Sequence, residues 1–443
     1  MKNTKLLIWI LLLSFGSTQL NAQDALPLSL KSAIDLMLEK NFDIQIVGKR
    51  LEDAQLNLGL GSAGFYPIID VGASQTNRYD NAKAVVTTNN RDESVNRSIR
   101  PYAQLNWTLF NGFVAQIRKD KYELLVNYSE GNVALVIENK IQALVLAYYQ
   151  ALLNIEKLNT IVKVKKLSSD RYDYMITKKG FGGAVSYDVL QAQNAFLSDS
   201  TNFLLQQLEL KKSFLNLNLL LGVDKSSKFE LTDDFTVFEA NYEYSLVESK
   251  MLSSNKTLTN QYINQEILKK NTSFSRTPLY PALRFSGGSD YSNLRVIYDG
   301  MPRINSYSFD FYANFSLSFN LFNGGNTRSA IQAAQIQEEI GKLEVDQMKQ
   351  SLSNALETIF EMYSIRKQLL SVANLSLEKA KLNLQLSTER FKSGAINSFN
   401  FRDVQLVYIN AEFNRLGAIY DLLDTNTEIL RLSGSIISEY EQP

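Results

Sequence analysis

The chain has 443 residues, of which 45% are apolar and 21% charged, so it can bury a large core. Its 46 lysines and arginines balance its 46 aspartates and glutamates, so there is no basic excess for binding nucleic acid. It has no cysteine and no histidine, which excludes disulfides, thiolate metal sites and imidazole chemistry. An enzyme that uses carboxylates, lysine or serine would need a convergent polar cluster, and the sequence shows none. We expect no metal, no cofactor and no enzymatic activity.

The first 22 residues have the layout of a secretory signal peptide. Lys2 and Lys5 precede an apolar run from Leu6 to Phe15, and a short polar stretch ends at Ala22. The alternative is a membrane anchor, but a spanning helix needs about 20 apolar residues and this run is about half as long. We expect cleavage after Ala22 and export of the rest of the chain.

The sequence Leu-Phe-Asn-Gly occurs twice, at Leu109–Gly112 and at Leu321–Gly324. Other landmarks recur at nearly the same spacing of 212 to 215 residues: Asn41 with Asn255, Tyr66-Pro67 with Tyr280-Pro281, Asp188-Val189 with Asp403-Val404, and Gly222 with Gly434. Repetition at a fixed period indicates a duplicated structural unit. The sequence predicts a first repeat at residues 23–227, a connector at 228–245 and a second repeat at 246–443.

Each repeat contains two segments that alternate between apolar and polar residues. The clearest runs from Phe309 to Leu321, where phenylalanine, alanine and leucine alternate with polar residues and tyrosine. Strict period-two alternation predicts a strand with one apolar face. The expected strands are about 65–75, 98–110, 280–291 and 307–321. A soluble β-sandwich is the alternative. A membrane sheet is favoured because there are only four strands among long helices, and because the strand lengths are close to the 9–11 residues of a tilted spanning strand.

The rest of each repeat is expected to be helical. No proline occurs between residues 102 and 277 or between 303 and 442, and apolar residues recur at coiled-coil spacing, as in Met348, Ala355 and Met362. The predicted helices are about 29–62, 112–178, 186–221, 246–275, 324–392 and 400–433. The long ones form two antiparallel hairpins.

Glycine-containing turns join these elements. Asn111-Gly112 and Asn323-Gly324 are the expected strand-to-helix turns, because glycine permits the change of direction. The helical hairpins turn at two tips, and Ser186 or Asn400 is expected to cap the returning helix. The tip residues are Gly180, Phe181, Gly182, Gly183, Ala184, Val185, Gly394, Ala395, Ile396, Asn397 and Ser398.

Four strands cannot close a barrel, and an open sheet edge in lipid leaves backbone groups without hydrogen-bond partners. The chain is therefore expected to supply part of a barrel shared between copies. Two copies would give eight strands with little interior space, whereas three would give twelve and leave a lumen.

The order of these motifs resembles the TolC family of outer-membrane efflux ducts. The resemblance rests on "LSLKSAIDLMLEKNFDIQI" at Leu28–Ile46, "GFYPIIDVGAS" before the first strand, both Leu-Phe-Asn-Gly motifs and both glycine tips followed by Asp-Val. It implies a mixed α/β membrane protein whose homotrimer forms a twelve-stranded barrel and a periplasmic tunnel of coiled-coil hairpins. It also implies a periplasmic adaptor that binds the hairpin tips and an inner-membrane transporter of the RND or ABC type.

Asp188 and Asp403 match acidic positions that, in the family, ring the periplasmic aperture. The alternative is purely structural, because acids in the first turn of a helix are favoured by the helix dipole. The chain departs from the family pattern at Leu406, where a second acid is common, and at Phe391 and Ile396, where some members have a locking tyrosine and arginine.

The sequence has features of two other functions. "GLGSAG" at Gly59–Gly64 fits a dinucleotide-binding pattern, but that fingerprint requires a strand before the glycines and a helix after them, which is the reverse of the order expected here. A soluble periplasmic scaffold or adaptor would use the same helices and bury the strands against each other. The sequence favours a passive exit duct of the outer membrane, serving tripartite efflux or type I secretion, over both alternatives.

Overall fold

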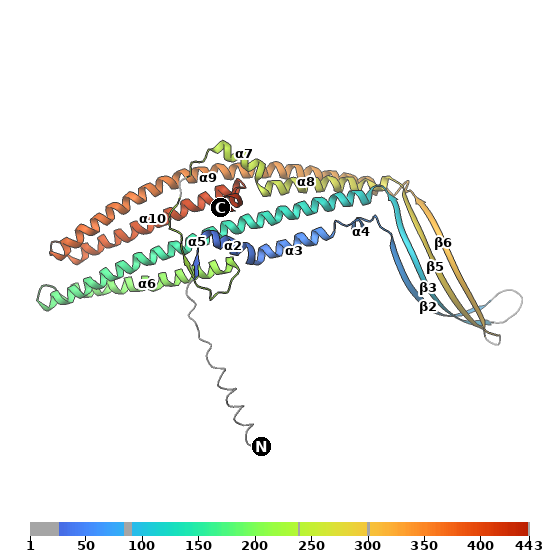
Figure 1. Cartoon of the computed structure of the whole chain (residues 1–443), viewed down its shortest axis with the longest axis horizontal. Coiled ribbons are helices and arrows are strands. Elements are labelled where there is room, and N and C mark those ends of the chain that lie inside the picture. Colours follow the sequence, from blue (N-terminus) through green and yellow to red (C-terminus); the bar gives the residue numbers. More distant parts are fainter. Residues whose placement is uncertain (1–25, 84–90, 238–239, 299–301, 442–443) are drawn as a thin grey trace, which may run out of the picture. The chain divides into compact units, whose positions relative to one another are not determined.

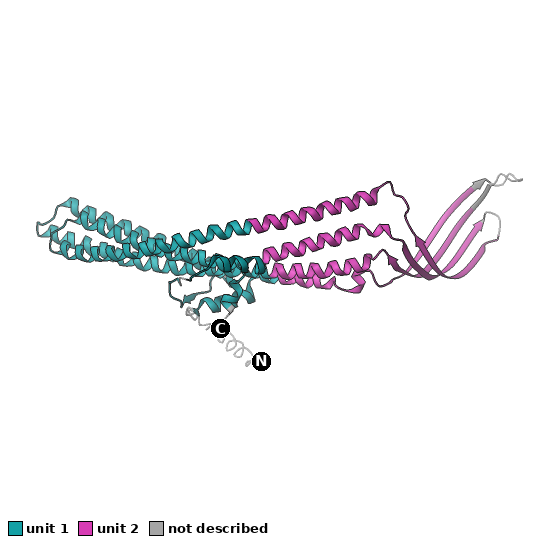
Figure 2. Cartoon of the chain, turned by 90° about the horizontal axis from the view of Figure 1, so that it is seen from above, with its two compact units in different colours: residues 1–46, 134–255, 351–443 teal, residues 47–133, 256–350 magenta. Residues whose placement is uncertain are grey.

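The computed structural model describes residues 26–83, 91–237, 240–298 and 302–441. The signal peptide predicted at residues 1–22 lies outside these ranges. The chain divides into two compact units (Figure 2). Unit 1 comprises residues 1–46, 134–255 and 351–443, and unit 2 comprises residues 47–133 and 256–350. Each unit combines segments from both sequence repeats.

The order of elements repeats along the chain (Figure 1). The first half contains β1 (Leu26–Leu28), α2 (Leu30–Lys40), α3 (Phe42–Leu56), α4 (Leu60–Ala63), β2 (Ile68–Lys83), β3 (Arg91–Asn111), α5 (Val114–Gly180) and α6 (Ser186–Leu221). The second contains β4 (Phe229–Leu231), α7 (Tyr244–Ser254), α8 (Lys256–Ser275), the 3-10 turn Thr277–Leu279, β5 (Ala282–Tyr298), β6 (Ile304–Ser318), α9 (Asn326–Lys392), α10 (Ser398–Leu432) and α11 (Ile436–Glu441).

The sheet of unit 2 has the strand order β2-β3-β5-β6, and every neighbouring pair is antiparallel. The register places the residues that the sequence predicts to be apolar beside one another on neighbouring strands. Leu105 pairs with Ile69 on one side and Gly287 on the other, and Phe285 pairs with Trp107 and Phe315. One face of all four strands is therefore mainly apolar.

This apolar face is open to the surroundings in the single chain. Every residue of β6 is exposed, and Phe311, Phe315 and Leu317 keep 75%, 70% and 73% of their surface accessible. The opposite face is polar, with Asp290 and Asp310 directly paired across β5 and β6. A soluble sandwich would bury the apolar face, so the structure does not support that alternative.

The strands differ from their predicted bounds. β2 and β3 extend beyond their predicted bounds at residues 75 and 98 as two polar arms. The arms are Thr76–Lys83 and Arg91–Ser98, which pair with each other. β5 likewise extends to Tyr298. These extensions are polar and fall outside the predicted strands, since apolar–polar alternation is lost there. β6 ends at Ser318 rather than at residue 321, and the register of β3 shifts between Thr108 and Phe110.

The two strand-to-helix turns use paired left-handed residues. Gly112 and Phe113 both have φ of 69°, and their counterparts Gly324 and Gly325 have 69° and 83°. The helices begin just after, at Val114 and Asn326, rather than at 112 and 324. The asparagines differ in role. Asn111 is the last residue of β3, whereas Asn323 Oδ1 accepts a hydrogen bond from the Thr327 amide at 3.3 Å.

The two turn glycines should respond differently to alanine. A Cβ on Gly112 would lie 2.5 Å from the backbone oxygen of Thr277, whereas a Cβ on Gly324 would meet no atom within 4 Å. Gly324→Ala should cost only about 1–2 kcal/mol for the left-handed conformation. Gly112→Ala should cost clearly more, because backbone must also move. Guanidinium unfolding of both variants checks this, and equal costs would contradict it.

Two predicted helices are broken at equivalent asparagines. The helix expected at 29–62 ends at Lys40 and restarts after Asn41, with a further break at residues 57–59, and the helix expected at 246–275 is interrupted at Asn255. Asn41 Nδ2 donates to Leu220 O at 2.8 Å, and Asn255 Nδ2 donates to Leu432 O at 3.0 Å. These bonds tie each break to the end of the returning helix and explain why the asparagine recurs.

The glycines that end the returning helices recur for a related reason. Gly222 and Gly434 have φ of 71° and 66° and lie directly against the backbone at Lys40 and Ser254. A side chain at either position would push the broken helix away. The repeated Asn41/Gly222 and Asn255/Gly434 pairs are thus one contact built twice in unit 1.

The core of unit 1 surrounds the fully buried Tyr148 of α5. Its hydroxyl lies 2.5 Å from Asp233 Oδ2, which also accepts a hydrogen bond from the Leu30 amide at 2.8 Å. Burial and the Asp233 carboxylate raise the pKa of Tyr148, so the phenol stays protonated.

The connector predicted at 228–245 contains regular secondary structure, because β4 pairs in parallel with β1 and α7 begins at Tyr244.

No helix within the described ranges combines the length and apolar character needed to cross a bilayer.

Candidate functional site

The first hairpin tip joins α5 to α6 through Phe181–Val185. Gly182 has φ of 78°, and the Gly183 amide donates back to Lys178 O at 2.9 Å, which closes the end of α5. The predicted cap Ser186 is wrong, because Ser186 is already the first residue of α6. The N-cap is Val185, whose amide donates a hydrogen bond to Asp188 Oδ2 at 3.4 Å.

The second tip repeats this geometry between α9 and α10. Gly394 also has φ of 78°, and the Ala395 amide donates to Arg390 O at 2.8 Å. The predicted cap Asn400 is wrong as well. Asn397 is the N-cap, with its Oδ1 accepting from the Asn400 amide at 2.8 Å, and Ser398 belongs to α10 rather than to the turn.

The two tips pack against each other within unit 1. Met175, Ala192, Phe391 and Phe401 form a small buried core, and the half-buried Ile396 lies against it. The Phe391 and Phe401 rings stack 4.8 Å apart with an interplanar angle of 5°. Phe391 and Ile396 therefore pack in this apolar core. At these two positions some family members have polar groups that lock the aperture.

The outer surface of the tips is apolar and accessible. Phe181 is 89% exposed, and Val185, Tyr187 and Phe399 are each more than 60% exposed. Gly180, Gly182 and Gly183 surround Phe181, with Ala184 partly covered, while Gly394 and Ala395 are exposed on the second tip. Exposed aromatic side chains with small neighbours are typical of a surface that binds another protein.

Asp188 lies in the first turn of α6, as the sequence predicts. Asp403 does not lie in the first turn of α10, because that helix begins at Ser398, two residues earlier than predicted, and its first turn contains no acid. Asp188 is half-buried and accepts a hydrogen bond from the Val185 amide, a contact that helps to begin α6. Asp403 is exposed. One chain does not bring copies of either residue together, so the aperture ring stays a prediction. No group of acidic side chains in the described ranges could hold a metal ion.

A layer of buried charge behind the tips was missed from sequence. Asp199 of α6 accepts two hydrogen bonds from Arg402 of α10, both at 2.7 Å, and the Asp199 side chain is only 3% exposed. This ion pair joins the two hairpins. The signal was present in the sevenfold row Ala192, Asp199, Gln206 and Ser213, in which an acid occupies a position that packing should bury.

Beside this pair lies Arg171 of α5, which is 3% exposed and donates from Nη1 to Ser398 O at 3.3 Å. Burial, and secondarily the charge of Arg402, lower the pKa of Arg171 to about 10, while Asp199 partly opposes this. At neutral pH the group remains charged.

Comparison with solved structures finds close similarity of fold over nearly the whole chain. The outer-membrane channel OprN matches with a TM-score of 0.75 at 15% identity, covering 92% of this chain and 90% of that one. The outer-membrane channel CmeC of Campylobacter jejuni matches with 0.73 at 16% identity, covering 92% and 85%. The MtrE outer-membrane channel of Neisseria gonorrhoeae, in its open state, matches with 0.66 at 14% identity, covering 92% and 89%.

A comparison with curated protein sequences finds no match. The family model for outer membrane efflux proteins matches residues 33–223 and 247–435, one segment in each repeat. These segments contain both hairpins, all four long strands and nearly all of the motifs on which the resemblance noted from sequence rests. The chain belongs to the outer membrane efflux protein family.

Proposed function

We propose that three copies of this chain form one outer-membrane duct, which passively conducts cargo delivered by a periplasmic adaptor and an inner-membrane transporter of the RND or ABC type. The observation that carries the proposal is the incomplete sheet of unit 2, with one apolar face exposed and two edges open. The chain itself would only conduct the cargo, since the energy for transport would come from the transporter.

The two open edges call for other copies of the chain. β2 and β6 each have a neighbour on one side only in the described sheet. In hydrocarbon each unsatisfied backbone group costs several kcal/mol, so an exposed edge of 15 or 16 residues could not persist there. Pairing β6 of one copy with β2 of the next is a head-to-tail contact, which forms a closed ring when the rotation between copies is a whole fraction of a turn. Three copies supply twelve strands and a lumen.

The helices of unit 1 have unpaired apolar rows that suit the same head-to-tail arrangement. On α6 the exposed row follows heptad spacing: Leu190, Leu197, Leu204, Leu208 and Leu215. On α9 the exposed row consists of Ile365, Leu369, Val372 and Leu386. Because the two rows lie on different helices, each copy could offer its α6 row to the α9 row of its neighbour.

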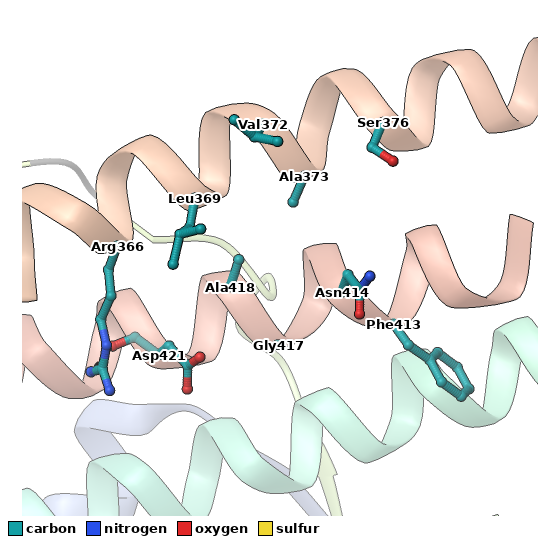
Figure 3. Close-up of a pocket in the computed structure, with 10 residues that line it drawn as sticks. All are labelled: Arg366, Leu369, Val372, Ala373, Ser376, Phe413, Asn414, Gly417, Ala418 and Asp421. Atoms are coloured by element: carbon teal, nitrogen blue, oxygen red, sulfur yellow. Dashed lines mark hydrogen bonds between the residues drawn. The ribbon is translucent and has the colours of Figure 1, made fainter. Parts of the chain in front are cut away.

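A groove beside the α9 row adds to this interpretation. Figure 3 shows it between α9 and α10, with Leu369 and Val372 on one wall and Gly417 and Ala418 on the other. A Cβ on Gly417 would meet no atom within 4 Å, so the groove has room for side chains of an adjacent helix. The groove thus supports packing between copies.

Conductance tests the proposal directly. The purified complex should insert into planar bilayers and form ion-conducting pores, and a variant unable to form the barrel should not. A preparation that stays in detergent-free buffer and never conducts would favour the soluble scaffold instead.

We also propose that the tips bind the adaptor. Because the chain has no cysteine, single cysteines can be placed freely. Phe181→Cys and Ala395→Cys should each cross-link the adaptor in intact cells, since both positions are exposed. Gly183 is less suitable, because a Cβ there would lie 3.1 Å from Lys178 Cγ. The control is Glu339→Cys, an exposed position on α9 in unit 2. Equal capture from Glu339→Cys would refute adaptor binding by the tips.

The aperture proposal concerns Asp188 and Asp403. Three copies of each would give six carboxylates around one axis, which would favour cations over anions. Asp403→Asn is the cleaner test, because Asp188 also contacts the amide that begins α6. The variant should shift the reversal potential in a salt gradient toward lower cation preference, whereas Glu209→Gln, on the exposed surface of α6, should not. An unchanged reversal potential for Asp403→Asn would contradict the proposal.

A further inference from the structure

A cavity of about 350 Å³ lies between the two hairpins of unit 1, close behind the tips. α5 contributes Leu167, Arg171 and Tyr174, α9 contributes Thr388 and Phe391, and α10 contributes Phe401. Exposed Asp170 and Lys392 complete the lining with opposite charges, which leaves the buried guanidinium of Arg171 as the excess charge of the cavity.

The charges around Arg171 do not balance. Arg171 and Arg402 lie near a single buried carboxylate, Asp199, which Arg402 engages with two 2.7 Å hydrogen bonds. Arg171 has one contact from Nη1 to Ser398 O, and its Nε has no hydrogen-bond partner among the described residues. Two buried cations that share one carboxylate leave a net positive charge, which is costly to bury, so the site favours an anion.

The walls indicate what kind of anion would fit. Phe391 stacks on Phe401, and the Tyr174 ring meets Phe391 edge to face with centroids 5.4 Å apart. Leu167 extends this apolar surface. An inorganic ion would leave these walls uncovered, whereas an apolar body with one acid group would cover them and reach the guanidinium.

We propose that this cavity is a binding site for a small organic anion, an aromatic or alkyl carboxylate, with its acid group on Arg171 and its body against Phe391 and Tyr174. The site contacts α5, α9 and α10, so a bound anion would hold the two hairpins together near the tips. This goes beyond conduction and does not require that the chain be a trimer.

The test uses 4-bromobenzoate as probe with the full-length protein in detergent. Crystals soaked with it should show anomalous bromine density in this cavity, and calorimetry should detect binding. Arg171→Met keeps much of the side-chain volume and removes the charge, so it should weaken binding by at least about tenfold. The matched control Lys381→Gln, an exposed cation of α9 outside the cavity, should bind normally.

A second comparison needs no variant. The neutral analogue 4-bromobenzamide has the same ring and should bind the unaltered protein at least about tenfold more weakly than the acid. Absence of bromine density, equal binding of acid and amide, or unchanged binding by a folded Arg171→Met protein would each overturn the proposal. Because binding is measured without conduction, failure here is distinct from failure of the duct.

Discussion

Asp199→Asn is expected to destabilise the paired hairpins by about 3–5 kcal/mol, because it leaves two buried guanidiniums without a counter-charge. The Asp199 and Arg402 side chains are 3% and 16% exposed, so water would screen little of the repulsion. Unfolding of the purified protein in guanidinium chloride, monitored by the circular dichroism signal of its helices, measures the loss of stability. The effect should be among the largest for any single polar substitution in unit 1.

The matched control lies on the same helix. Glu209 pairs with Lys212 on the exposed surface of α6, with side chains 54% and 60% accessible, so Glu209→Gln should change stability by less than about 1 kcal/mol. Combining Asp199→Leu with Arg402→Met should recover only part of the loss, since apolar residues of similar volume commonly replace buried ion pairs without cost but the buried charge of Arg171 remains. Equal effects of Asp199→Asn and Glu209→Gln would show that the buried pair does not join the hairpins.

Phe315→Arg is the second substitution with a large expected effect. Phe315 lies on the apolar face of β6, 70% exposed in the single chain, with its ring 4.9 Å from that of Phe285. If this face contacts lipid, an arginine on it costs at most about 2–4 kcal/mol, the value for the membrane midplane, and each copy would bear that cost. The variant should be lost from the outer-membrane fraction and from the heat-modifiable oligomer on gels.

Asn314→Arg provides the control one residue away. Asn314 lies on the polar face and pairs with Ser286, so an arginine there would face the lumen and should be tolerated. If both variants assemble equally well, the apolar face does not meet lipid. If Asn314→Arg alone fails, the two faces have been assigned the wrong way round.

Much of the fold could be predicted because the relevant signals are local and periodic. α6 has the predicted bounds, Ser186–Leu221, and α9 ends at Lys392 as expected. Long heptad rows between glycine turns leave little freedom in where such helices begin and end. The apolar–polar alternation of the strands likewise predicts which residues share the apolar face of the sheet, and the observed register aligns these residues.

The errors occur where distant contacts override local pattern. Asn41 and Asn255 break helices because their side chains bond the ends of α6 and α10, about 180 residues away in sequence, which no local rule reveals. The polar arms of β2 and β3 are strands because they pair with each other, although neither has strand-like alternation.

The candidate site was predicted in part. The tip glycines follow from turn chemistry, since the left-handed residues Gly182 and Gly394 end their helices in the same way. Asp199, Arg402 and Arg171 were missed, because their importance depends on burial between two hairpins rather than on spacing within one. A charged residue inside a heptad row is the signal that would have identified Asp199.

The central claim is that one chain supplies four strands of a barrel that only several copies can close. Native mass spectrometry of the detergent-solubilised protein tests it most directly. We expect a complex of three chains that falls apart only on unfolding. A stable single chain in detergent-free buffer, with the apolar face of β2, β3, β5 and β6 protected from chemical labelling, would contradict it.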